Sequence, residues 1–417
     1  MNYDQDPAVL LESYPAAYRS LRLALVTETY PPEVNGVAIT LQRLVQGLRA
    51  NNHHIQLVRP RQTVDREAAI QDGFAPLLTK GFPIPKYPHL RLGAPARKLL
   101  MANWQVNRPD LVHIATEGPL GWSALKVARK LKLPVTSDFR TNFDTYSRHY
   151  GMAWLKKPIG AYLRRFHNLC DATMVPTAKL RDELSQRDFE RLQVVARGVD
   201  TALFNPTKRS AELRQSWGVR DNQPVALSVG RLATEKNLPL LVQAAHAMRN
   251  ANPDVALVVV GDGPARQGFA QQCPFAIMAG FQTGEALAQH YASADIFLFP
   301  SLSETFGNVT LEAAASGLAI SAFDYAAASE LIVHADNGLV AAIDKPQDFI
   351  NNAIELATDT ALRHKLRSNA NASTQRMAWE AIVDQVQDVW LDLLRTPHTS
   401  PTQRVDTKTG FATAPQA

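Results

Sequence analysis

The sequence predicts an α/β protein with two doubly wound domains, each built on a parallel sheet. Short apolar runs bounded by turn residues alternate with stretches of helical periodicity, and this alternation appears in both halves of the chain. The runs are apolar at nearly every position, which is typical of strands covered on both faces. At one domain per roughly 150 residues, a chain of 417 residues has room for two or three domains.

In the first half, a buried strand at 21–26 leads into a loop with two prolines and Gly36. A helix follows, because apolar residues recur at helical spacing at Ile39, Leu41, Leu44, Val45 and Leu48. A strand at 55–58 completes a βαβ unit, which implies parallel pairing. Further strands are expected at 111–115, 135–137 and 173–175.

The second half repeats this order. Strands are expected at 225–229, 255–260, 296–299 and 318–321, and Gly317 is typical of the residue that follows a helix. The joint between the domains is expected at 196–206. A late helix is predicted by a stripe of Trp379, Ile382, Val383, Val386, Val389, Trp390 and Leu393. The residues from 396 onwards have the composition of a disordered tail.

Charge divides the chain unequally. Residues 1–200 carry 28 Lys and Arg against 18 Asp and Glu, a balance of +10, whereas the remainder carries 16 against 21. This predicts two domains with different partners, although drift of surface charge would give the same pattern. The basic residues are dispersed and no recognition motif is present, so nucleic-acid binding is not expected. Two cysteines and an N-terminus without signal-peptide features predict a cytoplasmic protein.

Three loops that follow strands in the second half are candidates for a ligand site, because open parallel sheets bind ligands there. The loop 230–237 contains Arg231 and Lys236, which suit a diphosphate but are also ordinary solvated cations. The loop 261–264 is rich in glycine, yet it matches neither a dinucleotide-binding fingerprint nor a P-loop. A tight turn would explain it equally well.

The third loop, 299–317, runs from a strand end into a helix expected to start between 305 and 308. A helix N-terminus presents free N–H groups to an anion. Glu304 and Glu312 would lie about 12 Å apart if the whole stretch were helical, a spacing that suits a ligand held at two points. The alternative is a capping residue and a solvated glutamate.

These residues carry a family resemblance. Glu304 and Glu312 match the E-x7-E motif of retaining GT-B glycosyltransferases of the family-4 (group 1) class, and the resemblance extends from about residue 21 to 390. It includes the TETYPPEVNGVAITL opening, the RGVD linker, the GRL-x3-KN loop and the VVVGDGP turn. The opening resembles enzymes that use GDP-mannose or UDP-hexoses on lipid acceptors, among them the mannosyl-, glucosyl- and sulfoquinovosyl-lipid branch.

The resemblance implies a GT-B fold, in which two Rossmann-like doubly wound domains face a central cleft. It implies an acceptor-binding domain at 1–198, a nucleotide-sugar-binding domain at 199–374 and a helix at 375–395 that crosses back, ahead of the tail at 396–417. Arg231 and Lys236 would bind the donor diphosphate, and Glu304 the donor sugar. The other implied donor-binding residues are Gly36, Gly230, Gly280, Phe281, Phe306, Gly307, Asn308, Val309 and Glu312, with Glu312 on the ribose.

One position departs from the family pattern. Many relatives carry a His-Thr pair after the strand that reads VTSDF, and this chain has Arg140 followed by Thr141. A guanidinium does not lose its proton and cannot act as a base. Arg140 is therefore expected to contact the donor or an anionic acceptor, and the alternative is a structural ion pair with Asp138 or Asp144.

The implied reaction is retaining transfer of a hexose, mannose or glucose, from a GDP- or UDP-sugar to a hydroxyl acceptor, with a glycolipid or phospholipid as candidate. The alternative is a sugar-nucleotide-binding protein or epimerase on the same fold. The resemblance implies no cofactor and no bound metal. Asp4-Gln5-Asp6 is interpreted as chance and His53-His54 as a surface turn.

The stretch 151–170 mixes aromatic residues with Lys156, Lys157, Arg164 and Arg165. This composition predicts either peripheral contact with the inner face of a membrane or an ordinary helix packed on the sheet.

Overall fold

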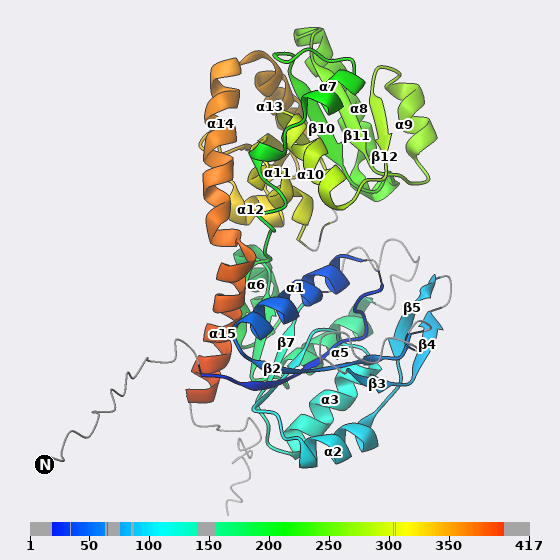
Figure 1. Ribbon diagram of the computed structural model, residues 1–417, viewed down its shortest axis with the longest axis vertical. Helices are drawn as coiled ribbons and strands as arrows, with labels where there is room; N and C mark the ends of the chain where they lie inside the picture. The colour runs from blue at the N-terminus through cyan, green and yellow to red at the C-terminus, as the bar shows by residue number, and fades with distance from the viewer. Residues whose placement is uncertain are drawn as a thin grey trace, which may run out of the picture.

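The computed structural model describes residues 19–33, 35–62, 65, 76–84, 87–140, 156–302, 304 and 306–395. It consists of two parallel α/β domains stacked along the longest axis of the molecule (Figure 1). The first sheet has the strand order β3-β2-β1-β6-β7-β8-β9 and the second the order β12-β11-β10-β13-β14-β15. The predicted fold class is confirmed.

The first domain surrounds the seven-stranded sheet with helices. Its strands are β1 (Arg22–Val26), β2 (His54–Pro60), β3 (Leu77–Thr79), β6 (Leu111–Ile114), β7 (Val135–Asp138), β8 (Ala172–Val175) and β9 (Leu192–Val194). An antiparallel hairpin is formed by β4 (Gly81–Ile84) and β5 (Tyr87–Gly93). The helices are α1 (Gly36–Ala50), α2 (Arg97–Val106), α3 (Pro119–Lys130), α5 (Lys156–His167) and α6 (Ala178–Ser185).

The pleat of β1 shows why the apolar run forms a central strand. Leu23 and Leu25 pack in the cluster that contains α1, whereas Ala24 and Val26 pack in the cluster that contains α2 and α3. Successive side chains of a strand point to opposite faces, so both faces of β1 must be apolar. The strand is therefore buried in the middle of the sheet, between β2 and β6.

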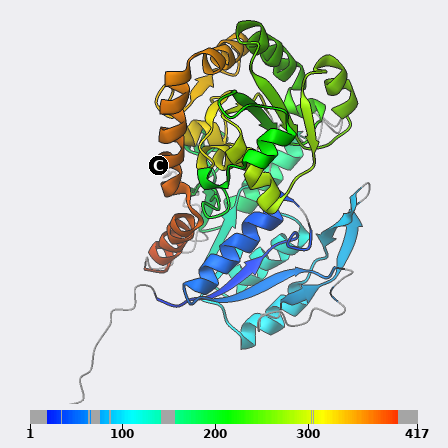
Figure 2. The same ribbon diagram turned by 45° about the horizontal axis from the view of Figure 1, so that its top comes forward.

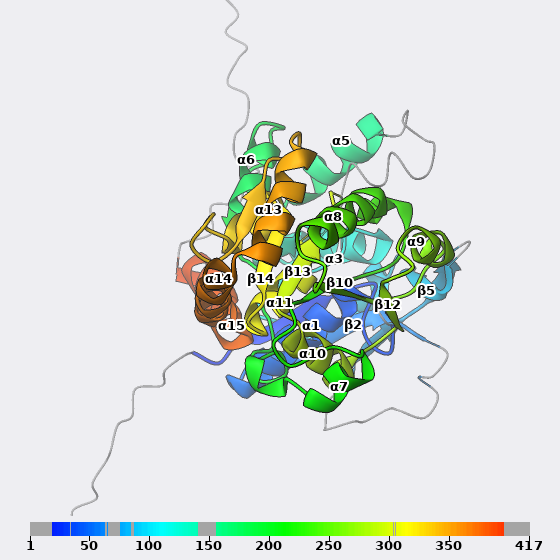
Figure 3. The same ribbon diagram turned by 90° about the horizontal axis from the view of Figure 1, so that it is seen from above.

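The second domain has the same layered plan. Its strands are β10 (Val225–Val229), β11 (Ala256–Val260), β12 (Ile277–Gly280), β13 (Ile296–Phe299), β14 (Ala319–Phe323) and β15 (Leu339–Ala341). Its α-helices are α7 (Ala211–Ser216), α8 (Leu238–Ala251), α9 (Arg266–Gln272), α10 (Gly284–Ser293), α11 (Asn308–Ala315), α12 (Ala327–Leu331), α13 (Pro346–Thr358) and α14 (Thr360–Ser373). Helices α8 and α13 cover one face of the sheet and α10 and α11 the other (Figure 3).

The chain returns to the first domain at its end. After α14 and the 3₁₀ turn η4 (Thr374–Met377), helix α15 (Trp379–Arg395) packs beside α1 (Figures 1 and 2). A Cβ at Gly47 of α1 would lie 2.5 Å from Cγ2 of Val383, so glycine is what lets the two helices approach this closely. Trp390 Nε1 also donates to Thr136 Oγ1 at 3.0 Å, which joins α15 to strand β7.

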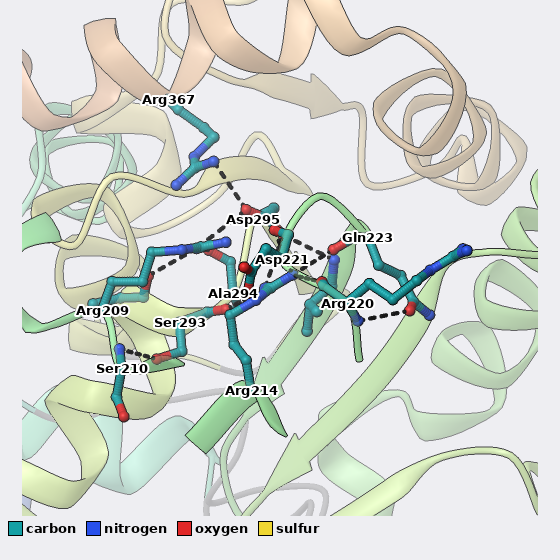
Figure 4. Close-up of polar contacts among 12 residues, drawn as sticks. Arg209, Ser210, Arg214, Arg220, Asp221, Gln223, Ser293, Ala294, Asp295 and Arg367 are labelled. Atoms are coloured by element: carbon teal, nitrogen blue, oxygen red, sulfur yellow. Dashed lines mark hydrogen bonds and ion pairs between the residues drawn. The ribbon is translucent and has the colours of Figure 1, made fainter. Parts of the chain in front are cut away.

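A charge cluster around the buried Asp295 joins the segment before α7 to the base of the second sheet (Figure 4). Asp295, just before β13, forms ion pairs with Arg209 at 3.3 Å, Arg214 at 3.4 Å and Arg367 at 2.9 Å. Arg214 is almost fully buried, and its guanidinium also donates to the Ser293 carbonyl at 2.7 Å. The carboxylate of Asp295 thereby connects the segment before α7, α7 itself and α14 to the start of β13.

Most predicted elements are present, with differences at the sheet edges. The strands β3, β9, β12 and β15 and the β4–β5 hairpin were not predicted from the sequence. His53 was predicted on a surface turn and is instead buried, bonding the Leu21 N–H through Nδ1 at 3.0 Å and Gln387 through Nε2 at 2.7 Å. Ile39, assigned to the apolar stripe of α1, is half exposed. The Asp4-Gln5-Asp6 segment and the predicted tail at 396–417 lie outside the described residues.

Candidate active site

The second sheet has a topological switch point between β10 and β13, where the strand order reverses direction. Ligands bind at such points in open parallel sheets, at the carboxyl ends of the strands. The loop after β10 contains Lys236 in the 3₁₀ turn η3 (Thr234–Lys236), and the loop after β13 contains Glu304. Sequence positions 68 residues apart are therefore brought together at this edge.

Lys236 and Glu304 form an ion pair across the switch point. Lys236 Nζ donates to Glu304 Oε1, and Ser301 Oγ donates to the same oxygen at 2.7 Å. The lysine also lies 6.0 Å from the ring centre of Phe299. Both side chains are mostly buried, with 23% and 15% exposed. The pair places one cation and one carboxylate at the sheet edge, and their roles toward a diphosphate and a sugar stay predictions.

Glycines shape the floor of this edge. A Cβ at Gly261 would lie 1.9 Å from the Gly230 carbonyl oxygen, and its φ of +134° is a conformation that favours glycine. A Cβ at Gly230 or Gly280 would meet nothing within 4 Å. The backbone at these three strand ends is thus tightly packed on one side and open on the other, which allows a ligand to lie close to the main chain.

Helix α11 begins beside Glu304. Its N-cap, Gly307, has a φ of +87° and supplies no side chain to the first turn. The first N–H groups of the helix, from Asn308 and Val309, therefore remain available to an anion. Phe306 is fully buried just before the turn, and its carbonyl accepts from Ala327 N at 2.7 Å. The predicted helix start is confirmed.

Glu312 lies one turn further into α11, partly buried. Tyr291 of α10 donates to its Oε2 at 2.9 Å. Burial raises the pKa of Glu312 to about 7, and the hydrogen bond from Tyr291 offsets part of this rise. The carboxyl is thus near half ionised at neutral pH.

Two predicted donor residues reach solvent instead of the buried part of the site. The Arg231 side chain is 65% exposed and meets Glu235 only at 3.9 Å. Phe281, after β12, is 70% exposed. Since both side chains are mostly exposed, a role in donor binding requires the ligand to extend to them.

The first domain has an equivalent switch point between β1 and β6. Glu28, after β1, is buried over Gly118 and accepts from Leu120 N at 3.0 Å, so it caps α3 from a distance. Burial raises its pKa to about 7. Gly36 begins α1 with open space around its Cβ position.

Arg140 follows β7 and pairs with Asp138. Its Nε donates to Asp138 Oδ2 at 2.9 Å, and Nη2 donates to the same oxygen. His113 Nε2 lies 3.3 Å from that oxygen. Although burial opposes it, Arg140 and His113 hold the pKa of Asp138 well below its usual range. Of the two ion pairs considered for Arg140, the one with Asp138 is present. The other possible partner, Asp144, lies outside the described residues.

One residue of this region was missed from the sequence. Arg197 follows β9, and its guanidinium carbon lies 5.7 Å from the ring centre of Phe306 in the second domain. It is the residue before Gly198 in the RGVD linker, where the sequence motif alone gave no reason to assign a contact across the domains. In the part of the chain described, no cluster of three or more His, Cys, Asp and Glu is arranged to hold a metal ion.

The two Rossmann-like domains, with parallel sheets of seven and six strands, form a GT-B fold. The model of glycosyltransferase family 4 matches residues 34–203, and that of the group 1 glycosyl transferases matches residues 209–373. The chain belongs to this family and is a retaining hexosyltransferase that uses a nucleotide sugar.

Its relatives cover most of its length. A GDP-mannose-dependent alpha-mannosyltransferase of Corynebacterium glutamicum is 30% identical over 90% of this chain and 90% of its own. The enzyme of that name from Mycobacterium tuberculosis is 31% identical over 88% of this chain and 95% of its own. A sulfoquinovosyl transferase of Arabidopsis thaliana is 28% identical over 88% of this chain and 72% of its own.

Solved structures agree on the fold. Sucrose-phosphate synthase of Thermosynechococcus elongatus superposes with a TM-score of 0.71 at 18% identity, over 90% of this chain and all of that one. HepE of Anabaena in complex with UDP gives 0.70 at 19% identity, over 89% of this chain and all of that one. At these identities the likeness extends to the fold alone.

Proposed function

We propose that the protein transfers mannose from GDP-mannose to a hydroxyl group of a lipid acceptor, with retention of configuration. The observation that carries this proposal is the Lys236–Glu304 pair beside the uncapped start of α11. The mannosyltransferases that are about 30% identical to this chain support GDP-mannose as the donor. Alpha-monoglucosyldiacylglycerol synthase of Acholeplasma laidlawii, 24% identical over 90% of this chain, supports a lipid acceptor.

In the proposed mechanism, the acceptor oxygen forms a bond to the anomeric carbon on the face from which the diphosphate departs. The bond between that carbon and the phosphate oxygen breaks, and the acceptor proton passes to the departing phosphate. Lys236, Arg231 and the N–H groups of α11 would stabilise the charge that develops on the phosphate. Glu304 would hold sugar hydroxyls, and Glu312 the ribose. Catalysis then rests on positioning and on charge stabilisation in a closed cleft.

The acceptor would approach from the first domain. Helix α5 buries Leu163 and Phe166 and exposes Lys157, Arg164 and Arg165, so it both packs on the domain and presents cations to solvent. Such a helix suits contact with an anionic membrane on the cytoplasmic side. In the part of the chain described, no helix is long and apolar enough to cross a membrane. Vesicle binding that survives reversal of these charges would contradict the membrane contact.

The test is a panel of GDP-mannose, UDP-glucose, UDP-galactose and ADP-glucose, measured by thermal shift and by slow hydrolysis with EDTA present. We expect GDP-mannose to raise the melting temperature most and to be hydrolysed without a metal. If another nucleotide sugar stabilises the protein more than GDP-mannose does, that sugar is the donor and the proposed donor is wrong. If no sugar is hydrolysed or transferred although one binds, the alternative of a sugar-nucleotide-binding protein is favoured.

A further inference from the structure

Two arginines, one after β7 and one after β9, line one small cavity in the first domain, with the end of β8 between them. The cavity measures about 40 Å³ and is bounded by the ends of β7, β8 and β9, by α1 and by α15. Asp138, Arg140 and Arg197 supply its charged side, while Leu44, Trp379 and others supply an apolar side. Since one water needs roughly 10–15 Å³ of such space, the cavity has room for a group of about three or four atoms.

The cavity contains two guanidiniums and one carboxylate, and Asp138 pairs with only part of the Arg140 guanidinium. Arg140 donates from Nε and Nη2 to Asp138, whereas its buried Nη1 has no hydrogen-bond partner among the described residues. The side chain is only 10% exposed. A buried donor without a partner is costly in a folded protein, so this nitrogen is placed to donate to an acceptor that enters the cavity.

Arg197 adds a second cation. Among the residues described, its guanidinium makes the ring contact with Phe306 and no hydrogen bond or ion pair. Burial lowers the pKa of Arg197 to about 9 and the charge of Arg140 adds to this, while Asp138 and Glu304 oppose it. Two guanidiniums and one carboxylate leave Arg140, Arg197 and Asp138 with one net positive charge. An anion of the right size would relieve this repulsion.

We propose that Arg140 and Arg197 form a binding site for an oxyacid anion, a carboxylate, phosphate or sulfonate, next to the reacting sugar. The ring contact with Phe306 places this site against the loop that contains Glu304. Planar guanidiniums match the geometry of such anions. The anion would be part of the acceptor or of the transferred sugar. This inference rests on the proposed function and specifies its substrate as an anionic one.

The first experiment measures anion binding directly. The purified protein is saturated with GDP, so that the diphosphate site is filled, and sulfate is compared with chloride at equal ionic strength by thermal shift and calorimetry. We expect sulfate to stabilise the wild type, and Arg197→Gln to weaken sulfate binding by about ten- to a hundredfold. Arg197→Lys keeps the charge but not the fork, and should keep part of the binding.

The matched control is Arg249→Gln. Arg249 lies 4.3 Å from the ring centre of Phe275, so it makes the same kind of contact in the second domain, on the α8 side of the sheet. This variant should bind sulfate like the wild type. Equal sulfate binding by Arg197→Gln and Arg249→Gln would overturn the inference. If GDP itself fails to stabilise the wild type, the proposed function fails instead.

The second experiment identifies which substrate supplies the anion. For the donor, binding of UDP-glucuronate is compared with that of UDP-glucose. For the acceptor, transfer to phosphatidylglycerol vesicles is compared with transfer to dioleoylglycerol in phosphatidylcholine vesicles. Arg197→Gln should reduce the preference for the anionic compound in one comparison and leave the other unchanged. Unchanged preferences in both comparisons would contradict the site.

Discussion

Glu312 makes donor binding depend on pH. With a pKa of about 7, the carboxyl is about nine-tenths ionised at pH 8 and about one-tenth ionised at pH 6. If its carboxylate accepts hydrogen bonds from the ribose, only the ionised form binds well. The affinity for GDP-mannose should therefore fall about tenfold from pH 8 to pH 6, or about 1.4 kcal/mol. The sugar diphosphate has no proton that titrates in this range.

The assay is calorimetric titration of GDP-mannose at pH 6, 7 and 8. Glu312→Gln should bind more weakly at pH 8 and show no such pH dependence. Glu355→Gln changes an exposed glutamate of α13 and should keep the tenfold effect. A wild-type affinity that does not change with pH, or a Glu312→Gln variant with the wild-type slope, would refute the role of this carboxyl.

The same variant has a predictable effect on stability. Because the pKa of Glu312 is raised in the folded protein, the wild type loses stability as pH increases from about 4.5 to about 7. The loss is at most about 3 kcal/mol. Glu312→Gln has no carboxyl to ionise at this position and does not lose this stability. The stability of the variant relative to the wild type should therefore increase between pH 5 and pH 8. Urea unfolding at both pH values measures the change, and a decrease would contradict the raised pKa.

Three further predictions concern other parts of the fold. Lys236→Met should lower kcat/KM by about 10²- to 10³-fold with little change in melting temperature, because the departing phosphate loses its cation; unchanged kinetics would remove Lys236 from the site. Gly261→Ala forces a Cβ onto the Gly230 carbonyl and should abolish the thermal shift caused by GDP, whereas a normal shift would show that the loop adapts. Asp295→Ala leaves buried guanidiniums without their carboxylate and should cost about 3–5 kcal/mol in urea unfolding. A loss below about 1 kcal/mol would contradict its anchoring role.

The central strands and the donor loops could be predicted because their signals are local. An apolar run such as 225–229 is buried on both faces, so its composition alone indicates a central strand. The edge strands β3, β9 and β15 have three residues each, too short for a periodic signal. The predicted domain limits at 198 and 374 and the roles of the site residues stay predictions.

What could not be predicted depends on contacts between distant segments. His53 carries no sequence signal for burial, because its hydrogen-bond partner Gln387 belongs to α15, more than 300 residues away. Arg197 gains its place from Phe306, which lies in the other domain. Arg140 could be assigned to the site by resemblance, but only the structure shows that its buried Nη1 has no partner among the described residues.

The most direct test of the proposed function is transfer of radiolabelled mannose from GDP-mannose to a lipid. The purified protein is incubated with EDTA and vesicles of dioleoylglycerol in phosphatidylglycerol, so that a neutral and an anionic hydroxyl acceptor are both present. We predict label in the chloroform phase, released by an α-mannosidase and absent with Glu304→Gln. No label in lipid, a β-linked product or an absolute requirement for a divalent cation would contradict it.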